Sequence, residues 1–185
     1  MEKPRLVREE VVFRGLRFDV VRKRYLKPGT GEFFERDVVL FPQAVAVLPF
    51  IDSSRIILLR QFRAPLNEYV VEVPAGVVDR GETPEETARR ELVEETGYTA
   101  ETLEKLGSFT PTPGYSSEVL HLYVARSLKY MGMKPEKYEV LEPFVIEFSE
   151  AYRMVLRGAI TDMKTALIIL LYSSKYSGGE QVFEY

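Results

Sequence analysis

The sequence predicts an α/β layered fold (α+β), in which a small antiparallel β-sheet precedes a larger α/β domain. Runs of β-branched and aromatic residues of strand length recur along the chain, and turn residues separate them. Helical segments lie among these runs instead of being grouped, which favours layers of helices and strands over a helical bundle or a doubly wound sheet. A chain of 185 residues, 45% of them hydrophobic, can bury the core that such a fold needs.

Residues 1–42 are expected to form a β-meander of three strands. The runs 7–13, 16–26 and 33–41 are rich in β-branched and aromatic residues, and a turn rich in proline and glycine separates the last two. So small a sheet has too few residues to close a core of its own. It must therefore pack on the main domain or on a second copy of itself, and we expect a homodimer formed through residues 1–42.

The rest of the chain, residues 43–185, is expected to form the main domain. Strands are predicted at the apolar runs 44–50, 55–62, 68–74, 103–109, 119–125 and 143–148. The polar stretch 129–139 is expected to be an exposed loop. Two helices are predicted near the C-terminus, one capped by Ser149 and one capped by Asp162.

A short helix with marked ends is predicted near the middle of the chain. Thr83 suits the N-cap, Pro84 suits the first helical position, and Glu86 can complete a capping box. Gly97 suits the left-handed residue that ends a helix. The helix is therefore expected between Thr83 and Gly97.

This helix carries three acidic residues on one side. Glu94 and Glu95 follow Glu91 by three and four positions, and each like-charged pair at this spacing costs about 0.2–0.5 kcal/mol. Arg90 offsets part of the repulsion because it lies four positions before Glu94. A hard divalent cation such as Mg²⁺ or Mn²⁺ would offset the rest, since such ions prefer carboxylate oxygens. The alternative is a solvated acidic face without a ligand.

The segment that contains this helix resembles the signature of the Nudix hydrolase family, G-x5-E-x7-R-E-U-x-E-E-x-G-U. The fixed positions are filled by Gly76, Glu82, Arg90, Glu91, Leu92, Glu94, Glu95 and Gly97. Tyr98 is the one departure, because an aliphatic residue is more usual there. The resemblance implies an α/β/α sandwich with a mixed sheet. It also implies hydrolysis of the diphosphate in a nucleoside diphosphate that is linked to another group.

The same resemblance implies roles for residues of the helix and of the strand before it. Glu91 and Glu95, together with Glu94, would hold the cation, and the backbone carbonyl of Ala75 would add an oxygen ligand. Arg90 would orient these glutamates for catalysis. The implied cofactor is Mg²⁺, with Mn²⁺ as a substitute, because such ions neutralise the diphosphate and lower the pKa of a bound water.

A loop rich in proline and glycine, residues 110–118, follows the next predicted strand, and we call it the Pro-Gly loop. Pro113 stands 15 residues beyond Tyr98, and the run 113–118 resembles the P-G-x-x-S-E loop of the ADP-ribose pyrophosphatase branch of the family. The resemblance implies that Glu118 is the general base acting on the attacking water. The alternative is a rigid surface turn, because proline and glycine are common turn residues.

Three further residues are candidate contacts with the substrate, and two of them, Arg36 and Arg63, lie where the resemblance implies such contacts. Arg36 and Arg63 would bind phosphate or ribose, since a guanidinium offers its donors in a fixed fork. Each can equally be a solvated arginine at the end of a strand. Glu72 would hold a ribose hydroxyl or a cation.

Charge and composition limit the partners that the protein is expected to bind and the residue types that can carry its acid–base chemistry. The net charge of −3 and the lack of a basic cluster argue against a nucleic-acid partner. The sequence contains no leader and no apolar run near the roughly 18 residues of a membrane span, so we expect a cytoplasmic protein without a membrane partner. The chain has no cysteine and one histidine, His121, so carboxylates are expected to carry the acid–base chemistry.

The reaction that the resemblance implies is Mg²⁺-dependent hydrolysis of ADP-ribose to AMP and ribose 5-phosphate, by attack of water on phosphorus. Two alternatives stay open. The same machinery can serve another nucleoside diphosphate derivative, such as a nucleotide sugar or a dinucleoside polyphosphate. A domain that keeps the fold without catalysis would be a nucleotide-binding sensor, although the complete acidic signature argues against it.

Overall fold

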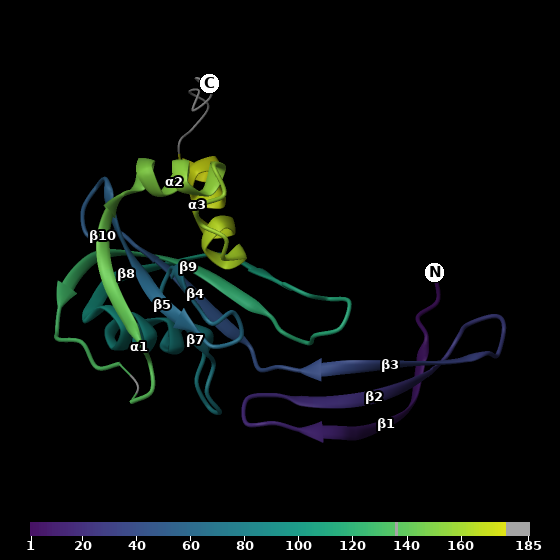
Figure 1. Ribbon diagram of the computed structural model, residues 1–185. Helices are drawn as coiled ribbons and strands as arrows, with labels where there is room; N and C mark the ends of the chain where they lie inside the picture. The colour runs from purple at the N-terminus through teal and green to yellow at the C-terminus, as the bar shows by residue number, and fades with distance from the viewer. Residues whose placement is uncertain (136, 177–185) are drawn as a thin grey trace. The chain divides into compact units, whose positions relative to one another are not determined.

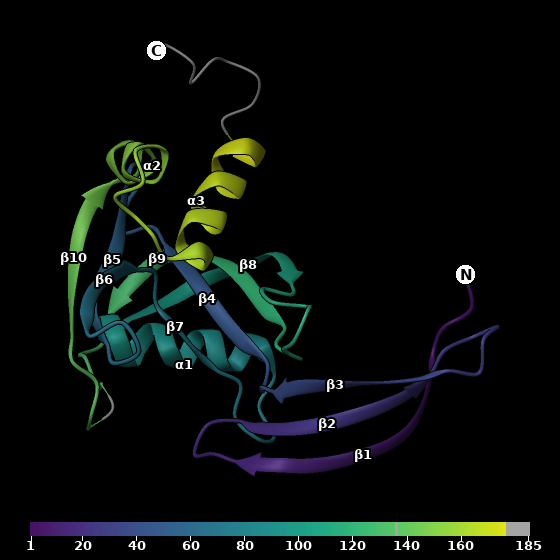
Figure 2. The same cartoon turned by 45° about the vertical axis from the view of Figure 1, so that its right-hand side comes forward.

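The computed structural model describes residues 1–135 and 137–176, and its elements are shown in Figure 1 and, turned by 45°, in Figure 2. The chain divides into two compact units. One consists of Met1–Ala44 with Phe109–Leu120, and the other consists of the remaining described residues. The N-terminal unit therefore includes the Pro-Gly loop, a second segment that the predicted boundary after residue 42 did not assign to it.

The N-terminal unit contains an antiparallel sheet of strands β1 (Arg5–Arg14), β2 (Asp19–Leu26) and β3 (Phe33–Leu40), in the order β1-β2-β3. This confirms the predicted meander. Strand β2 begins three residues later than predicted because the chain first makes a tight turn, in which the Gly15 amide donates to the Phe18 carbonyl at 3.0 Å.

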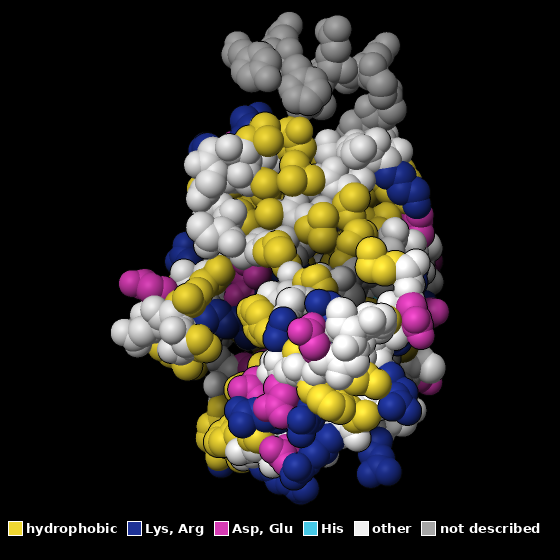
Figure 3. Space-filling model, turned by 90° about the vertical axis from the view of Figure 1, so that its right-hand side faces the viewer, with side chains coloured by type: hydrophobic (Ala, Val, Ile, Leu, Met, Phe, Trp, Pro, Cys, Tyr) yellow, Lys and Arg dark blue, Asp and Glu magenta, His cyan; other side chains and the backbone are white. Residues whose placement is uncertain are grey.

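The meander has almost no core of its own. Of its residues, all of which the structure describes, only Val21 is a buried hydrophobic, with 1% of its surface exposed. Pairs across the strands stabilise the sheet instead. Arg22 donates to Asp37 at 2.8 and 3.0 Å, and the rings of Tyr25 and Phe34 stack with their centroids 5.3 Å apart. Figure 3 shows a face of the molecule on which apolar side chains lie exposed among charged ones.

The larger unit contains two further sheets. Their strands are β4 (Ala44–Pro49), β5 (Arg55–Arg63), β6 (Glu68–Glu72), β7 (Ala75–Val77), β8 (Tyr98–Phe109), β9 (Leu120–Tyr130) and β10 (Leu141–Glu147). One sheet has the order β7-β4-β9-β8 and the other has the order β10-β5-β6. The described residues form three helices, α1 (Pro84–Thr96), α2 (Phe148–Leu156) and α3 (Met163–Tyr176). Helix α1 lies on one side of the strands and α2 and α3 lie on the other (Figure 2), which confirms the predicted α/β/α layers.

Strand β4 is at the centre of the core and is buried at all of its positions. On one side of the strand, Val47 belongs to the same buried cluster as Leu92 of α1. Just beyond the end of the strand, the ring of Phe50 lies 4.6 Å from that of Tyr172 in α3. Helices on both sides thus pack against this strand, and the packing holds α1 in place.

Two strands are longer than predicted. Strand β8 begins at Tyr98, directly after α1, and β9 continues to Tyr130, whereas the predictions were 103–109 and 119–125. The two strands are neighbours in the sheet, and each extends past the apolar run on which its prediction depended. Because β8 and β9 contain polar residues at these ends, the apolar runs alone did not predict where the two strands begin and end.

The two C-terminal helices differ in how they begin. Helix α2 begins at Phe148, so the prediction that Ser149 caps it was wrong. The Phe148 amide donates instead to the Ser54 carbonyl at 2.8 Å. Asp162 caps α3 as predicted, because its carboxylate accepts from the Thr165 amide at 3.0 Å. Within the described part of the chain, no helix has both the length and the apolar character needed to cross a bilayer.

Candidate active site

Helix α1 has both of its predicted ends. The Thr83 hydroxyl accepts from the Glu86 amide at 3.2 Å and the Glu86 carboxylate accepts from the Thr83 amide at 2.8 Å, so the capping box is complete. At the other end Gly97 has φ +80°, the left-handed conformation that favours glycine. A side chain on Gly97 would also meet the ring of Tyr130. These constraints fix the extent of the helix that carries the acidic residues.

Arg90 lies at the centre of the acidic cluster. Its guanidinium donates to Glu82 at 3.0 Å and to the Val77 carbonyl at 3.2 Å. It also donates to Glu91 at 2.6 Å and to Glu94 at 3.0 Å. The hydrogen bond from Arg90 lowers the pKa of Glu82 to about 2, so Glu82 is ionised at neutral pH. One cation thus orients three carboxylates, a geometry that suits the role predicted for Arg90.

Glu91 and Glu95 are buried on α1. Glu95 is fully buried, and Glu91 is 8% exposed. The Oε2 atom of Glu95 accepts from the Ala75 amide at 2.8 Å, whereas its Oε1 atom has no hydrogen-bond partner among the residues that the structure describes. Burial raises the pKa of Glu95 well above its ordinary value and raises that of Glu91 to about 7. An unpaired buried polar atom costs about 1–3 kcal/mol, and Arg90 bonds to Glu91 and Glu94 but not to Glu95, so the Oε1 atom of Glu95 is the place in the cluster where a partner is missing.

The close approach of β7 to α1 explains the glycine at position 76. A Cβ atom on Gly76 would overlap the carboxylate of Glu91. The neighbouring Ala75 amide is the group that binds Glu95. Strand β7 thus runs so near the acidic side of α1 that its backbone, rather than a side chain, faces the carboxylates.

The donor set fits a hard divalent cation. Within residues 1–135 and 137–176, no three acidic, histidine or cysteine side chains are gathered as a ready metal site, and Glu91 and Glu94 instead contact Arg90. The Oε1 atom of Glu95 still offers a buried oxygen donor, and a cation would favour the ionised forms of Glu91 and Glu95. Carboxylate oxygens are the ligands that Mg²⁺ and Mn²⁺ prefer. These three glutamates therefore remain the predicted ligands.

Glu139 was missed by the sequence reasoning, yet its charge acts on the same cluster. Burial is the main cause of the raised pKa values of Glu91 and Glu95, and the carboxylate of Glu139 raises both of them further. Glu139 lies in the loop between β9 and β10, which was predicted only as an exposed polar stretch; residue 136 of that stretch lies outside the described residues. Glu139 is a single glutamate in a polar loop and belongs to no motif with a fixed spacing, so the sequence alone did not mark it as a site residue.

Hydrogen bonds attach this loop to two elements of the site. Near its start, the Lys134 amide donates to the Glu94 carbonyl of α1 at 3.1 Å. At its end, the Phe62 amide of β5 donates to the Val140 carbonyl at 2.9 Å. Glu139 directly precedes Val140, so its backbone is held beside β5.

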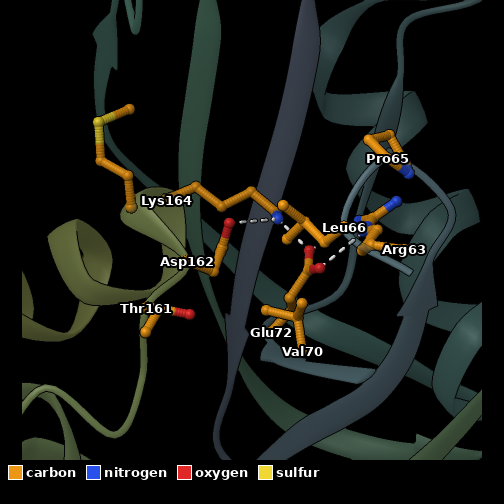
Figure 4. Close-up of a pocket in the computed structure, with 9 residues that line it drawn as sticks. Arg63, Pro65, Leu66, Val70, Glu72, Thr161, Asp162 and Lys164 are labelled. Atoms are coloured by element: carbon orange, nitrogen blue, oxygen red, sulfur yellow. Dashed lines mark hydrogen bonds and ion pairs between the residues drawn. The ribbon is translucent and has the colours of Figure 1, made fainter. Parts of the chain in front are cut away.

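Glu72 is the centre of a second charged cluster (Figure 4). It is 2% exposed, and Arg63 donates to its two carboxylate oxygens at 2.6 and 2.7 Å. Lys164 of α3 forms an ion pair with Glu72 and another with Asp162 at 3.0 Å. Burial raises the pKa of Glu72, but the hydrogen bonds and charges of Arg63 and Lys164 outweigh burial and hold the pKa below its ordinary value. Glu72 is therefore ionised at neutral pH.

These residues line a pocket of about 320 Å³. Its lining consists of Arg63, Pro65, Leu66, Val70, Glu72, Thr161, Asp162, Met163 and Lys164 (Figure 4). One part of the lining is apolar, and another presents two cations and two carboxylates. The pKa of Glu95 is raised mainly by burial, and the charge of Arg63 opposes this rise. Arg63 thus links the pocket electrostatically to the acidic cluster on α1.

The structure brings Arg63 and Glu72, both predicted as substrate contacts, into this one pocket. Lys164 and Asp162 were not predicted to be there, because Asp162 was interpreted only as a helix cap. One signal was available for Lys164. A lysine in the first turn of a helix opposes the helix dipole, so its position calls for another partner.

The two other predicted site residues lie in the N-terminal unit. Arg36 of β3 places its guanidinium 5.2 Å from the centroid of the Phe34 ring and donates to the Glu35 carbonyl at 2.7 Å. The amide of Glu118, in the Pro-Gly loop, donates to the Ser116 hydroxyl at 3.2 Å. Their predicted contacts with substrate and water stay predictions.

Comparisons with known proteins agree with the geometry of the acidic helix. Residues 40–163 match the family model described as the NUDIX domain. The chain is 38% identical over 165 residues to an ADP-ribose pyrophosphatase of Bacillus subtilis (strain 168), covering 88% of this chain and 89% of that protein. It is 33% identical over 171 residues to a GDP-mannose pyrophosphatase of Cronobacter sakazakii (strain ATCC BAA-894), covering 85% of each.

A solved structure of an ADP compounds hydrolase has the same fold. It superposes with a TM-score of 0.85 and covers 96% of both chains, at 23% sequence identity. The family match spans α1, its preceding strand and the pocket residues contributed by β5 and β6. The chain therefore belongs to the Nudix hydrolase family.

Proposed function

We propose that this Nudix hydrolase cleaves the diphosphate of ADP-ribose with the help of Mg²⁺, yielding AMP and ribose 5-phosphate. The observation that carries the proposal is the unpaired, buried Oε1 atom of Glu95, close to Glu91 on the same helix. A cation would supply the partner that this oxygen lacks. Relatives named for ADP-ribose and for GDP-mannose support a nucleotide-sugar type of substrate.

The residues that would hold the cation are Glu91, Glu95 and Glu94, with the carbonyl of Ala75. When bound, Mg²⁺ or Mn²⁺ supplies positive charge to the diphosphate and acidifies the attacking water. Arg90 keeps Glu91 and Glu94 oriented through its hydrogen bonds, and the Ala75 amide orients Glu95. Because these carboxylates are fixed before substrate arrives, they need little reorganisation during the reaction.

The pocket supports a sugar phosphate as the group beside the cation. Arg63 and Lys164 present two positive charges there, and phosphate oxygens suit both side chains. Glu72 and Asp162 offer carboxylate acceptors for ribose hydroxyls. Arg36 of the N-terminal unit remains the further predicted phosphate contact.

A loop carboxylate would act as the general base, and two are candidates. Glu118 is favoured by the resemblance of the Pro-Gly loop to that of the ADP-ribose pyrophosphatase branch. Glu139 is favoured by its electrostatic effect on Glu91 and Glu95, which belong to the same unit as Glu139. A base must reach the attacking water near the cation, so this effect makes Glu139 the stronger candidate.

One assay tests the proposed reaction. The purified protein is incubated with Mg²⁺ and, in turn, with ADP-ribose, GDP-mannose, NADH and a diadenosine polyphosphate, and the products are separated by chromatography. We expect the highest kcat/KM with ADP-ribose, and AMP as a product. A higher kcat/KM with another compound would reassign the substrate, and the absence of turnover with all of them would favour a sensor.

A matched pair of variants shows whether turnover depends on the acidic cluster. Glu95→Gln keeps the size of the side chain but removes the charge that would hold the cation. We expect it to lower kcat by at least about a thousandfold. Glu101→Gln, which changes an exposed glutamate on β8, serves as the control and is expected to leave kcat within twofold.

We also propose that the meander forms a homodimer with a second copy of itself. Its large exposed apolar side chains include Leu6, Val7, Val11, Val12 and Phe13 of β1. Only Val21 of this sheet is a buried hydrophobic, and the five side chains of β1 are each 43–55% exposed, so a single copy leaves much of their apolar surface in water. Covering such a surface is favourable by about 25 cal/mol per Å².

A further inference from the structure

The outer edge of β3 carries backbone groups that β2 does not pair. Strand β3 is the last strand of its sheet, with β2 on its inner side. The amide and carbonyl of Val39, and those of Phe41 just after the strand, bond to the Pro-Gly loop instead. An edge of this kind is normally left to water or to another chain. Here the loop covers it.

Backbone groups of the loop pair with Val39. The Val39 amide donates to the Tyr115 carbonyl at 2.8 Å, and the Ser117 amide donates to the Val39 carbonyl at 3.0 Å. These bonds form a parallel bridge between Val39 and Ser116. The loop thus adds a short segment to the edge of the sheet.

At Phe41 the loop is attached through a side chain, that of Ser117, instead of through its backbone. The Ser117 hydroxyl accepts from the Phe41 amide at 2.9 Å and donates to the Phe41 carbonyl at 3.1 Å. A hydroxyl can do both because it is a donor and an acceptor, whereas alanine at this position could do neither. Beyond it, the Ala44 amide donates to the Val119 carbonyl at 2.9 Å, so Glu118 lies between two attached residues.

We propose that Ser117 is a positioning residue, whose hydroxyl docks the Pro-Gly loop on β3 and so sets the place of Glu118 for hydrolysis. The proposal rests on the proposed function, since it requires the loop to serve the reaction. Ser117 is exposed, so core packing does not demand a serine. The two bonds of its hydroxyl are therefore the physical reason for the residue.

Three variants separate docking from other effects. Ser117→Ala removes both bonds to Phe41, and Ser117→Thr keeps the hydroxyl. Ser116→Ala is the matched control, because among the described residues the Ser116 hydroxyl accepts from the Glu118 amide within the loop and does not bond to β3. Each variant is compared with the wild type by amide hydrogen exchange at Phe41 and by kcat and KM.

We expect Ser117→Ala to speed exchange of the Phe41 amide on the order of tenfold, as the loss of one or two net hydrogen bonds implies. Its kcat/KM should fall by a similar factor, and Ser117→Thr should restore both to within about threefold. Ser116→Ala should leave exchange at Phe41 unchanged.

Two results would overturn the proposal. Unchanged exchange at Phe41 in Ser117→Ala would mean that the hydroxyl does not dock the loop. Faster exchange with kcat and KM both within twofold of the wild type would mean that docking does not serve the reaction. Kinetics use whichever nucleotide the wild type cleaves best. A wild type that cleaves none overturns the proposed function on its own, and a positioning role with it, while the exchange rates still report whether Ser117 docks the loop.

Discussion

Glu91 shows how burial and charge oppose each other within a single residue of the site. Its pKa is raised to about 7, first by burial and then also by the nearby carboxylates, although Arg90 opposes the shift. A carboxyl group in this environment holds its proton longer in the folded protein than in the unfolded chain. Folding stability and metal binding are therefore both linked to its ionisation.

The metal-free protein should lose stability as the pH rises from about 5 to 8. Between its ordinary pKa and the folded value near 7, Glu91 binds more protons in the folded state, so the free energy of unfolding falls with pH over this window. The loss should be on the order of 1–3 kcal/mol. Urea unfolding in EDTA, carried out at about pH 5 and about pH 8, measures this loss in the free energy of unfolding.

Magnesium should reverse that loss. Added Mg²⁺ should raise Tm more at pH 8 than at pH 5, because the cation binds the ionised carboxylates. Glu72 and Glu82, whose pKa values are lowered, change stability only below about pH 4.5 and so do not enter the window. An equal rise in Tm at the two pH values would contradict the assignment of Glu91 to the metal site.

The general base can be identified by comparing Glu139→Gln with Glu118→Gln. The base acts in the transition state, so its loss should lower kcat by about 10²–10⁴ while KM changes little. We expect this result for Glu139→Gln and a smaller effect for Glu118→Gln. Rate measurements across pH provide a further check, since loss of the base should also remove the acidic limb of the profile. A large kcat effect confined to Glu118→Gln would instead identify Glu118 as the general base.

At the scale of elements, the sequence predicted best where local chemistry decides the structure. The capping box at Thr83 and the glycine stop at Gly97 were sufficient to place α1, and apolar runs rich in β-branched and aromatic residues located the strands, although not the full lengths of β8 and β9. The pocket could not be predicted in the same way, because Lys164 reaches Glu72 only after α3 packs near β6. Glu139 was missed for a similar reason, since its proximity to α1 depends on tertiary structure.

The contact between β7 and α1 predicts a specific cost for adding one methyl group. Gly76→Ala would push its Cβ into the Glu91 carboxylate, so either the strand or the side chain must move. We expect a destabilisation of about 1–3 kcal/mol and a large loss of turnover. Urea unfolding and the ADP-ribose assay measure the two effects.

Gly114→Ala is the matched control for this substitution. A Cβ atom there has no neighbour within 4 Å among the described residues, and the backbone is not in the left-handed region. Its stability should therefore stay within about 0.5 kcal/mol of the wild type. Equal losses in the free energy of unfolding for the two substitutions would mean that the approach of β7 to α1 is not the cause of the destabilisation.

For the whole molecule, the exposed apolar side chains of the meander lead to a prediction about its oligomeric state. Val11→Glu combined with Phe13→Glu places charges among exposed apolar side chains of β1, and should convert a dimer into a monomer in sedimentation velocity. Leu156→Glu, on α2 in the larger unit, is the control and should leave the dimer intact. A double variant that still sediments as a dimer would refute the interface through residues 1–42.

The N-terminal unit is built from two stretches, Met1–Ala44 and Phe109–Leu120, which are remote from each other in the gene. Mutations in one stretch must therefore be compatible with the other, although recombination can easily separate them. A chimera that inherits only the first stretch from a relative would bring in a β3 whose edge was adapted to a foreign loop. Engineers who graft this region should transplant both stretches together.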